Sequence, residues 1–360
     1  MTNFNAGAWR PAAGKTRAAQ LASANDLVTR TLAQHGLTVG PLAGMPANGS
    51  SDMLNTSLSS LMARLHPSGR PVADTLDLPN GARFTEASFT CAAGTRAYRT
   101  YVPASAQDGV TGLVVMLHGC TQTPEDFAVG TGMNALAERH RFIVVYPRQS
   151  RGDNAQSCWN WFSRGDQKRD RGEPAILAGL TREVVSLHGI PEDKVFVAGL
   201  SAGAAMAVIL GGTYPDIFKA VGAHSGLPAG AAKDVPSAFA AMAGREAASA
   251  PRTAVTRSIV FHGAADATVH PSNGERIVRQ ALEGDTGQSL QTEKASTMNG
   301  RSYRHSTTYD ANGRETAEHW IVEGLGHAWS GGQPAGSYTD PQGPDASAEM
   351  IRFFFGPAAD

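Results

Sequence analysis

The sequence predicts an α/β protein, in which a mostly parallel β-sheet carries helices on both of its faces. Short apolar runs, such as "GLVVMLHG" at 112–119 and "FIVVYP" at 142–147, alternate with longer segments of helical periodicity. Because strands buried on both faces appear as continuous apolar runs, this alternation indicates a parallel sheet. Forty glycines and twenty prolines are consistent with the many turns that such a chain needs.

The first 75 residues differ from the rest of the chain. Residues 16–35 predict an amphipathic helix, which packs either on the main domain or on a second subunit of a homodimer. The apolar residues at helical spacing are Leu21, Ala24, Val28 and Leu32. Residues 36–75 are rich in Gly, Pro, Ser and Ala and predict a linker or loose arm. We therefore divide the chain into an N-terminal arm at 1–75 and an α/β domain at 76–360.

The elements of this domain follow in order. The segments "ARFTEASFT" and "RAYRTYVP" predict a β-hairpin around Ala93-Gly94. Further strands are expected at 112–119, 142–147, 195–198, 218–226, 257–263 and 318–327. Helices are expected near 130–140 and at 174–187, 272–283 and 347–355.

The stretch "VFVAGLSAGAAMAVILGG" at 195–212 places a serine between two glycines where a strand gives way to a helix. Gly199 and Gly203 permit backbone angles and close contacts that a Cβ would block. A serine at such a turn, next to a helix N-terminus, is typical of the nucleophile elbow of an α/β-hydrolase. Ser201 is therefore the candidate nucleophile.

A serine hydroxyl needs a base to take its proton, and a carboxylate to fix the tautomer of that base. Asp266 follows an apolar strand in "VFHGAADATVHP", and His327 lies on a glycine-lined loop in "VEGLGHAWSGG". The order Ser, Asp, His along the chain is that of an α/β-hydrolase. We expect these three residues to form a catalytic triad.

Other residues fit these roles less well. Asp216 lies in a predicted helix-to-strand turn, and His262 and His270 are too close to Asp266 in sequence. His224 ends a predicted strand near the site, where it either packs or contacts substrate.

The oxyanion of an acyl-transfer intermediate needs two backbone N–H donors. Ala202 follows the nucleophile and supplies one; the other is expected from Cys120 in "LHGCTQTPEDF". The aromatic residues of "SCWNWF" either wall a substrate pocket or pack their own loop. The expected substrate contacts are Trp159, Trp161, Trp329, Gln122 and His224.

Composition excludes several other classes. With 31 basic and 32 acidic residues, the chain has no field that favours nucleic acid or an anionic membrane. No apolar run reaches the roughly 20 residues that span a bilayer. No metal or cofactor is expected.

The absence of an apolar leader predicts a cytoplasmic protein, or a secreted or periplasmic one if a leader was removed. A bridge between Cys120 and Cys158, if they lie close, would instead indicate an oxidising compartment.

Several motifs together resemble the polyhydroxybutyrate depolymerase family of esterases, within the α/β-hydrolase superfamily. They are "LHGCTQTPEDFAVGTGMNALAERHRFIVVYP", "CWNW", "GEPAILAGL", "GLSAGAAM" and "GHAWSGG", and the resemblance runs from about residue 95 to 355. It implies Ser201 as nucleophile, Asp266 as acid, His327 as base, and a disulfide between Cys120 and Cys158 behind the oxyanion loop. Similar proteins include polyester depolymerases, acetyl and feruloyl esterases and poly(aspartic acid) hydrolases.

The leading hypothesis is a serine hydrolase without a cofactor that cleaves carboxylic esters, such as polyhydroxyalkanoate oligomers or aryl esters. No separate polymer-binding domain is expected after the hydrolase, so soluble oligomers, amorphous polymer or small esters are expected rather than crystalline polymer. One alternative keeps the triad and cleaves an anionic polyamide such as poly(aspartic acid). Basic residues that suggest it are Arg148, Arg151, Arg164, Lys168, Arg169 and Arg171. A second alternative is a non-catalytic protein that binds polymer granules.

Overall fold

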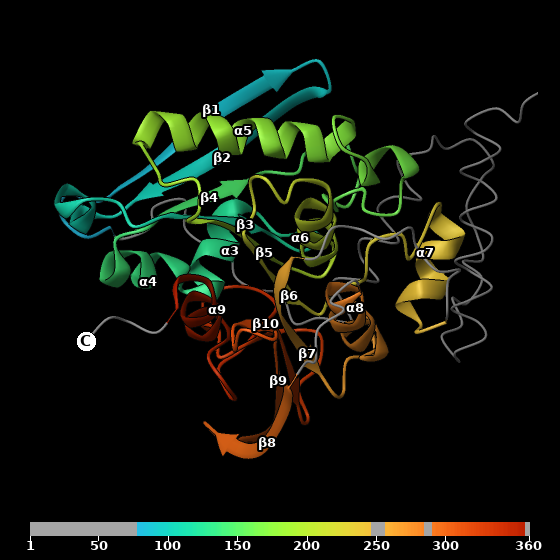
Figure 1. Cartoon of the computed structure of the whole chain (residues 1–360). Coiled ribbons are helices and arrows are strands. Elements are labelled where there is room, and N and C mark those ends of the chain that lie inside the picture. The colour runs from blue at the N-terminus through green and yellow to red at the C-terminus, as the bar shows by residue number, and fades with distance from the viewer. Residues whose placement is uncertain (1–77, 246–255, 284–289, 357–360) are drawn as a thin grey trace, which may run out of the picture. The chain divides into compact units, whose positions relative to one another are not determined.

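The computed structural model describes residues 78–245, 256–283 and 290–356. The predicted arm at 1–75, with its helix at 16–35, lies outside the described residues. A sheet of ten strands forms the centre of the described part, in the order β1-β2-β4-β3-β5-β6-β7-β10-β9-β8 (Figure 1). No described helix is both long enough and apolar enough to cross a bilayer.

Six neighbouring strands in the middle of the sheet run parallel to one another. They are β3 (Leu113–Leu117), β4 (Ile143–Pro147), β5 (Val195–Leu200), β6 (Ala220–His224), β7 (Arg257–Gly263) and β10 (Glu315–Val322). Every residue of β3 to β6 is buried, as their continuous apolar sequences require. The predicted α/β class with a mostly parallel sheet is confirmed, and all six strands were expected close to these positions.

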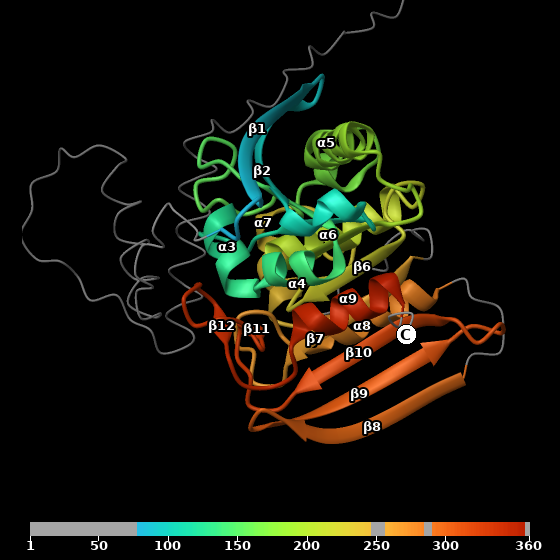
Figure 2. The same ribbon diagram turned by 90° about the vertical axis from the view of Figure 1, so that its left-hand side faces the viewer.

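An antiparallel hairpin closes each edge of the sheet (Figure 2). The first consists of β1 (Arg83–Cys91) and β2 (Gly94–Val102), which the sequence predicts. The second consists of β8 (Leu290–Met298) and β9 (Arg301–Tyr309), which it does not. The residues of β8 are mostly exposed on both faces, so this strand lacks the alternation of apolar and polar residues that identifies a half-buried strand.

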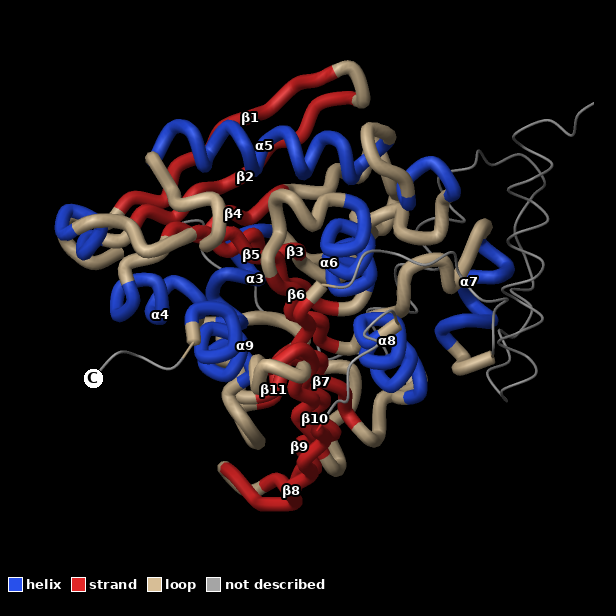
Figure 3. Tube along the Cα trace, viewed as in Figure 1, coloured by secondary structure: helices blue, strands red, loops and turns tan. Residues whose placement is uncertain are grey.

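Helices cover both faces of the sheet (Figure 3). The helices α3 (Pro124–Thr131), α4 (Met133–His140) and α9 (Ala346–Phe355) share one apolar cluster with side chains such as Val114 and Met116 of β3. The other face carries α5 (Gly172–His188) and α6 (Ala202–Thr213), which pack against Val115 and Leu117, and α8 (Ser272–Leu282), which packs against α6. This is the architecture of an α/β-hydrolase.

Smaller elements lie in the connections. They are α7 (Val235–Met242), the 3-10 helices η1 (Ala104–Asp108) and η2 (Arg164–Gln167), and a two-stranded sheet of β11 (Trp329–Ser330) and β12 (Thr339–Asp340). The helix expected near 130–140 is two helices, because Gly132 between them has a positive φ of 64°. That conformation ends α3 in a left-handed C-cap, for which glycine is favoured.

Candidate active site

Ser201 occupies the turn between β5 and α6, where its backbone adopts φ 57° and ψ −118°. Such angles cost a residue other than glycine roughly 1–3 kcal/mol and recur at functional sites. The N–H of Ser201 donates a 2.9 Å hydrogen bond to the carbonyl oxygen of His224, the last residue of β6. The serine is therefore held in a strained turn at the carboxyl edge of the parallel strands.

The two glycines of the motif permit close contact between this turn and its neighbours. A Cβ added at Gly203 would lie 2.0 Å from the carbonyl oxygen of Leu117, and one at Gly199 would lie 2.5 Å from the carbonyl carbon of Gly203. Only glycine allows the start of α6 to approach the end of β3 so closely. The first helical amide, that of Ala202, consequently lies beside the turn that follows β3.

Asp266 and His327 come from the loops that follow β7 and β10, and they are hydrogen-bonded to each other. Nδ1 of His327 lies 2.8 Å from Oδ2 of Asp266. The other carboxylate oxygen, Oδ1, accepts hydrogen bonds from the backbone N–H groups of Thr268 and Val269, each at 2.9 Å. Burial opposes ionisation of Asp266, but the hydrogen bond from His327 and the Val269 amide outweigh it, so its pKa lies below the ordinary value.

The loops of the acid and the base are in direct contact. A Cβ on Gly263, at the end of β7, would lie only 2.2 Å from the carbonyl oxygen of Leu325. His262, fully buried, lies with Nε2 at 2.8 Å from the carbonyl oxygen of Val269 and 3.6 Å from Oδ2 of Asp266. His262 is too close to Asp266 in sequence to be the catalytic base, yet its side chain holds the loop on which Asp266 lies.

His224 connects the turn of the nucleophile with the loop of the base. Its carbonyl accepts from Ser201, and its Nε2 accepts a 3.0 Å hydrogen bond from the N–H of Ser330, three residues after His327. Burial lowers the pKa of His224 to about 3, so the imidazole is neutral and can accept this bond. His224 has no exposed surface, which corrects the expectation that it contacts substrate.

The turn after β3 contains the expected second oxyanion donor. The N–H of Gly119 donates to Oε1 of Gln122 at 2.9 Å, and the N–H of Thr121 donates to the carbonyl oxygen of Gln156 at 2.8 Å. Among the turn, loop and cap hydrogen bonds of the described residues, the amides of Cys120 and Ala202 donate none. The turns after β3 and β5 therefore each contain one backbone N–H group that donates no hydrogen bond of this kind.

The turn at 118–121, named the oxyanion turn after its expected role, is stabilised from within the protein by Gln122. Besides accepting from Gly119, it donates through Nε2 to Asp126 at 3.0 Å and to the carbonyl oxygen of Ser337 at 3.1 Å. Its side chain is buried. The structure therefore gives Gln122 a positioning contact in place of the expected substrate contact.

The expected aromatic substrate contacts lie in the interior. Trp159 is fully buried and donates its indole N–H to the carbonyl oxygen of His118 at 3.0 Å. Trp329 is also buried, with its indole N–H on Oγ of Ser347. Trp161 is 6 % exposed and packs edge-on against Phe162. Of the two alternatives for this loop, the structure therefore favours packing over a pocket wall.

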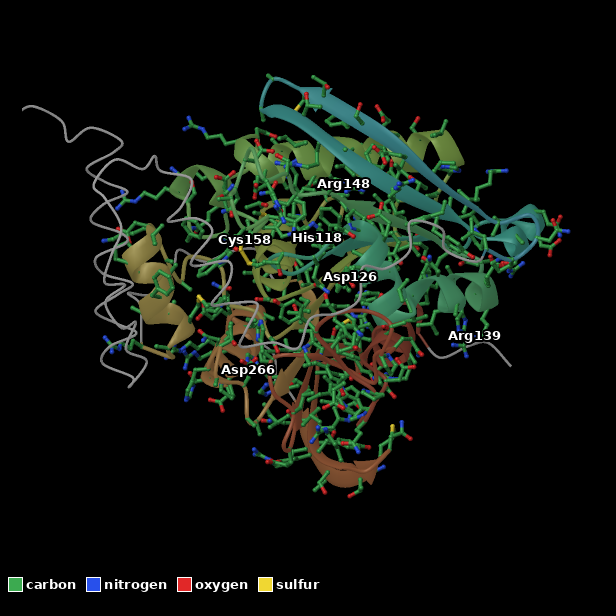
Figure 4. All side chains as sticks on the ribbon, turned by 180° about the vertical axis from the view of Figure 1, so that it is seen from behind. His118, Asp126, Arg139, Arg148, Cys158 and Asp266 are labelled. Carbon is green, nitrogen blue, oxygen red and sulfur yellow. A yellow bond between two sulfur atoms is a disulfide. The ribbon has the colours of Figure 1, made fainter. Side chains whose placement is uncertain are left out.

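Cys120 and Cys158 form a disulfide, as the family resemblance implies. It is the yellow bond next to the label of Cys158 in Figure 4. The bridge joins the turn after β3 to the loop that contains Trp159 and Trp161. Cys91 is a free cysteine.

The remaining candidates have other partners. Asp216 is half-exposed and forms ion pairs with Arg169 at 2.6 Å and Arg182 at 3.1 Å. Arg148 is paired with Glu125 at 2.7 Å. Two of the cations that suggested an anionic polymer are thus neutralised by carboxylates. Among the residues that the structure describes, no three His, Cys, Asp or Glu side chains are grouped so that they could hold a metal ion.

The central parallel strands and the helices on both faces of the sheet define the fold of an α/β-hydrolase. A solved acetyl xylan esterase from Aspergillus awamori has the same fold, with a TM-score of 0.56 and 22% identity, over 72% of this chain and 94% of its own. The family model described as esterase PHB depolymerase matches residues 96–286. The chain belongs to this family. The matched range includes Ser201 and Asp266 and ends before His327.

Curated relatives agree with this assignment. The poly(3-hydroxyalkanoate) depolymerase C of Paucimonas lemoignei is 33% identical over 231 residues, which are 60% of this chain and 54% of that protein. The poly(3-hydroxybutyrate) depolymerase of Ralstonia pickettii is 29% identical over 64% of this chain and 51% of its own length. A probable acetylxylan esterase A of Aspergillus flavus is 29% identical over 50% of this chain and 64% of its own. The chain thus spans about half the length of the two depolymerases.

Proposed function

We propose that this protein is a serine hydrolase that cleaves carboxylic esters through an acyl-enzyme. The observation that supports it most is the 2.8 Å hydrogen bond between His327 and Asp266 at the edge of the sheet where the strained turn presents Ser201. Since Nδ1 of His327 is engaged with the carboxylate, Nε2 is the nitrogen that can accept a proton.

In the proposed reaction, Oγ of Ser201 attacks the ester carbonyl carbon while its proton passes to Nε2 of His327. The negative charge that develops on the carbonyl oxygen is stabilised by the N–H groups of Ala202 and Cys120. His327, charged and paired with Asp266, then protonates the departing alkoxide. Water attacks the acyl-enzyme with His327 again as base, which releases the acid and restores Ser201.

The substrate class that we propose is an ester of a hydroxyalkanoate oligomer or a related polyester or aryl ester. The names of the curated relatives support it, because they are depolymerases of poly(3-hydroxyalkanoates) and acetylxylan esterases. The pairing of Arg148 and Arg169 with carboxylates gives no support to an anionic polyamide. The granule-binding alternative has no support from the described residues.

The test replaces Ser201 by Ala and measures the release of p-nitrophenol from p-nitrophenyl butyrate. We expect turnover to fall to the level of the reaction without enzyme, and labelling by a fluorophosphonate probe to disappear. A panel of hydroxybutyrate oligomers, feruloyl esters and poly(aspartate) then identifies the acyl group. Activity of Ser201→Ala equal to that of the parent would refute the assignment of the nucleophile.

We also propose that the protein works in an oxidising compartment, which was the second of the two expectations for its location. The disulfide between Cys120 and Cys158 supports this, because such bonds persist outside the reducing cytoplasm. Non-reducing mass spectrometry of protein isolated from its native cells would detect the bridge. A fully reduced pair there would contradict the proposal.

A further inference from the structure

The motif "GEP" at 172–174 belongs to the family resemblance, but the triad and the oxyanion donors do not use it. Its glutamate, Glu173, lies in the first turn of α5 and is 5 % exposed. A buried carboxylate is costly unless several donors surround it, so its contacts indicate what it is needed for.

The contacts of Glu173 lead to the loop at 154–162, which lies behind the oxyanion turn. One carboxylate oxygen, Oε2, accepts from the backbone N–H of Asn160 at 2.8 Å, and Oε1 accepts from the side-chain amide of Asn160 at 3.0 Å. Oε1 also accepts from the side-chain amide of Gln149. The same Gln149 amide donates to the carbonyl oxygen of Cys158 at 2.9 Å. Glu173 therefore anchors the loop both directly and through Gln149.

This loop in turn fixes the position of the oxyanion turn through three separate links. The Cys120–Cys158 disulfide is the first. The second is the hydrogen bond from the N–H of Thr121 to Gln156, and the third is that from the indole of Trp159 to His118. These links hold His118, Cys120 and Thr121, which together with Gly119 form one continuous turn. A displacement of the loop would therefore displace the Cys120 amide.

A neutral amide could not replace the carboxylate in this arrangement. Glu173 receives N–H groups from Asn160 and Gln149, and Nη2 of the buried Arg96 lies 3.6 Å from Oε1. A glutamine at 173 would turn an NH₂ group toward one of these donors and leave it without an acceptor. Burial raises the pKa of Glu173 to about 7, against the opposing effects of Asn160, Arg96 and Gln149. The carboxylate oxygens suit these donors because the ionised form only accepts hydrogen bonds.

We propose that Glu173 is a positioning residue for ester hydrolysis: it holds the loop at 154–162 so that the Cys120 amide stays aimed at the oxyanion. The proposal rests on the proposed function. It assigns Glu173 no contact with substrate. Its effect should appear in the stabilisation of the transition state rather than in substrate binding.

The experiment compares Glu173→Gln with Glu183→Gln in the full chain, with p-nitrophenyl butyrate as substrate. Glu183 is an exposed carboxylate on the same helix that accepts a hydrogen bond from the hydroxyl of Tyr98, and it has no link to the loop. We expect kcat of Glu173→Gln to fall about tenfold with KM within twofold of the parent. This is part of the roughly 100–1000-fold loss that follows removal of one oxyanion donor. Glu183→Gln should keep the kcat of the parent.

A second readout separates positioning from a general loss of structure. Phenylboronic acid bonds to the serine and resembles the tetrahedral transition state, with an oxygen in the oxyanion hole, whereas butyrate, the product, binds without that bond. We expect the inhibition constant of the boronic acid to rise about tenfold in Glu173→Gln, while that of butyrate stays within twofold. All assays run at least 15 °C below the measured Tm of each variant. If Glu173→Gln does not fold, the milder Asn160→Ala, which removes one donor to Glu173, should show the same pattern with about a threefold change.

The outcomes also separate this proposal from the proposed function. A parent protein without esterase activity or fluorophosphonate labelling overturns both. An active parent with an unchanged kcat in Glu173→Gln overturns the role of Glu173 alone. So does a variant in which kcat and KM deteriorate together and both inhibitors weaken equally, because that pattern indicates a disordered site.

Discussion

Asp266 and His327 lie 61 residues apart in the chain and are joined by a hydrogen bond of 2.8 Å between Oδ2 and Nδ1. The carboxylate cannot rotate freely, because its other oxygen is held by the amides of Thr268 and Val269. The pair therefore presents one tautomer of the imidazole, with the proton on Nδ1 and the lone pair on Nε2. In the proposed mechanism that lone pair accepts the proton of Ser201.

Replacing Asp266 by Asn should separate the tautomer from the geometry. The amide NH₂ of asparagine can donate to Nδ1, which favours the tautomer with its proton on Nε2, where it cannot act as a base. We expect kcat to fall by about 10⁴-fold with little change in KM, the size of effect that the same change has in a serine protease triad. Asp216→Asn, on the half-exposed rival carboxylate, is the control and should retain full activity. Loss of activity in Asp216→Asn alone would reverse the two assignments.

Gly203→Ala should disrupt the nucleophile turn by steric clash. The new Cβ would lie 2.0 Å from the carbonyl oxygen of Leu117, and backbone atoms cannot move aside as a flexible side chain can. We expect loss of most esterase activity and a destabilisation of at least about 2 kcal/mol, as for other overpacked sites. Urea denaturation and p-nitrophenyl butyrate turnover measure the two effects. Gly165→Ala is the control and should change neither quantity, because its Cβ would have no neighbour nearer than 3.9 Å. If Gly203→Ala keeps the stability and the activity of the parent, α6 and β3 are not in contact.

The sequence was sufficient for those features whose signal is local. Buried parallel strands appear as apolar runs, and the glycines around Ser201 mark a turn that needs them, so both could be read directly. Asp266 and His327 each follow a predicted parallel strand, so both were expected at the carboxyl edge of the sheet. In the structure they are hydrogen-bonded to each other there.

Features that depend on distant contacts could not be read in this way. Trp159 and Trp329 are large aromatic residues of the kind that line substrate pockets. Whether such a ring faces the substrate or the core depends on the loops that pack over it. His224 ends a strand near the site, and only the position of Ser330 shows that its imidazole is an internal acceptor. The strand β8 was missed because exposure on both faces removes the periodic pattern.

Removing the disulfide should lower both stability and activity. Cys158→Ser opens a bridge across 38 residues of sequence, for which the loss of chain constraint costs about 3–4 kcal/mol in free energy of unfolding. Because the bridge holds the oxyanion turn, kcat should fall with KM nearly unchanged. Cys91→Ser removes the free thiol and is the matched control. If Cys158→Ser unfolds at the same urea concentration as Cys91→Ser, the bridge contributes no stability.

Stability should also decline as the pH falls below about 6.5, because buried imidazoles resist protonation. Burial lowers the pKa of His118 to about 4 and that of His224 to about 3, from 6.5. Between these values the unfolded chain binds protons that the folded protein does not, so the free energy of unfolding decreases with falling pH. Each proton contributes about 1.4 kcal/mol per pH unit. Glu173 has the opposite effect on the free energy of unfolding. Its pKa is raised from 4.5 to about 7, so the folded protein binds this proton at a higher pH than the unfolded chain does.

Urea denaturation at pH 7.5, 6.0 and 5.0 measures this dependence, and His118→Gln tests its source. The neutral glutamine does not titrate, so the decline in free energy of unfolding between pH 6 and 5 should be smaller in this variant, by about 1.4 kcal/mol per pH unit. His118→Gln also loses the hydrogen bond from the N–H of Gln149 to Nε2, which lowers stability at every pH and leaves the slope unaffected. The parent protein, measured at the same three pH values, is the control. An identical slope in His118→Gln and the parent would mean that His118 takes up its proton as readily folded as unfolded.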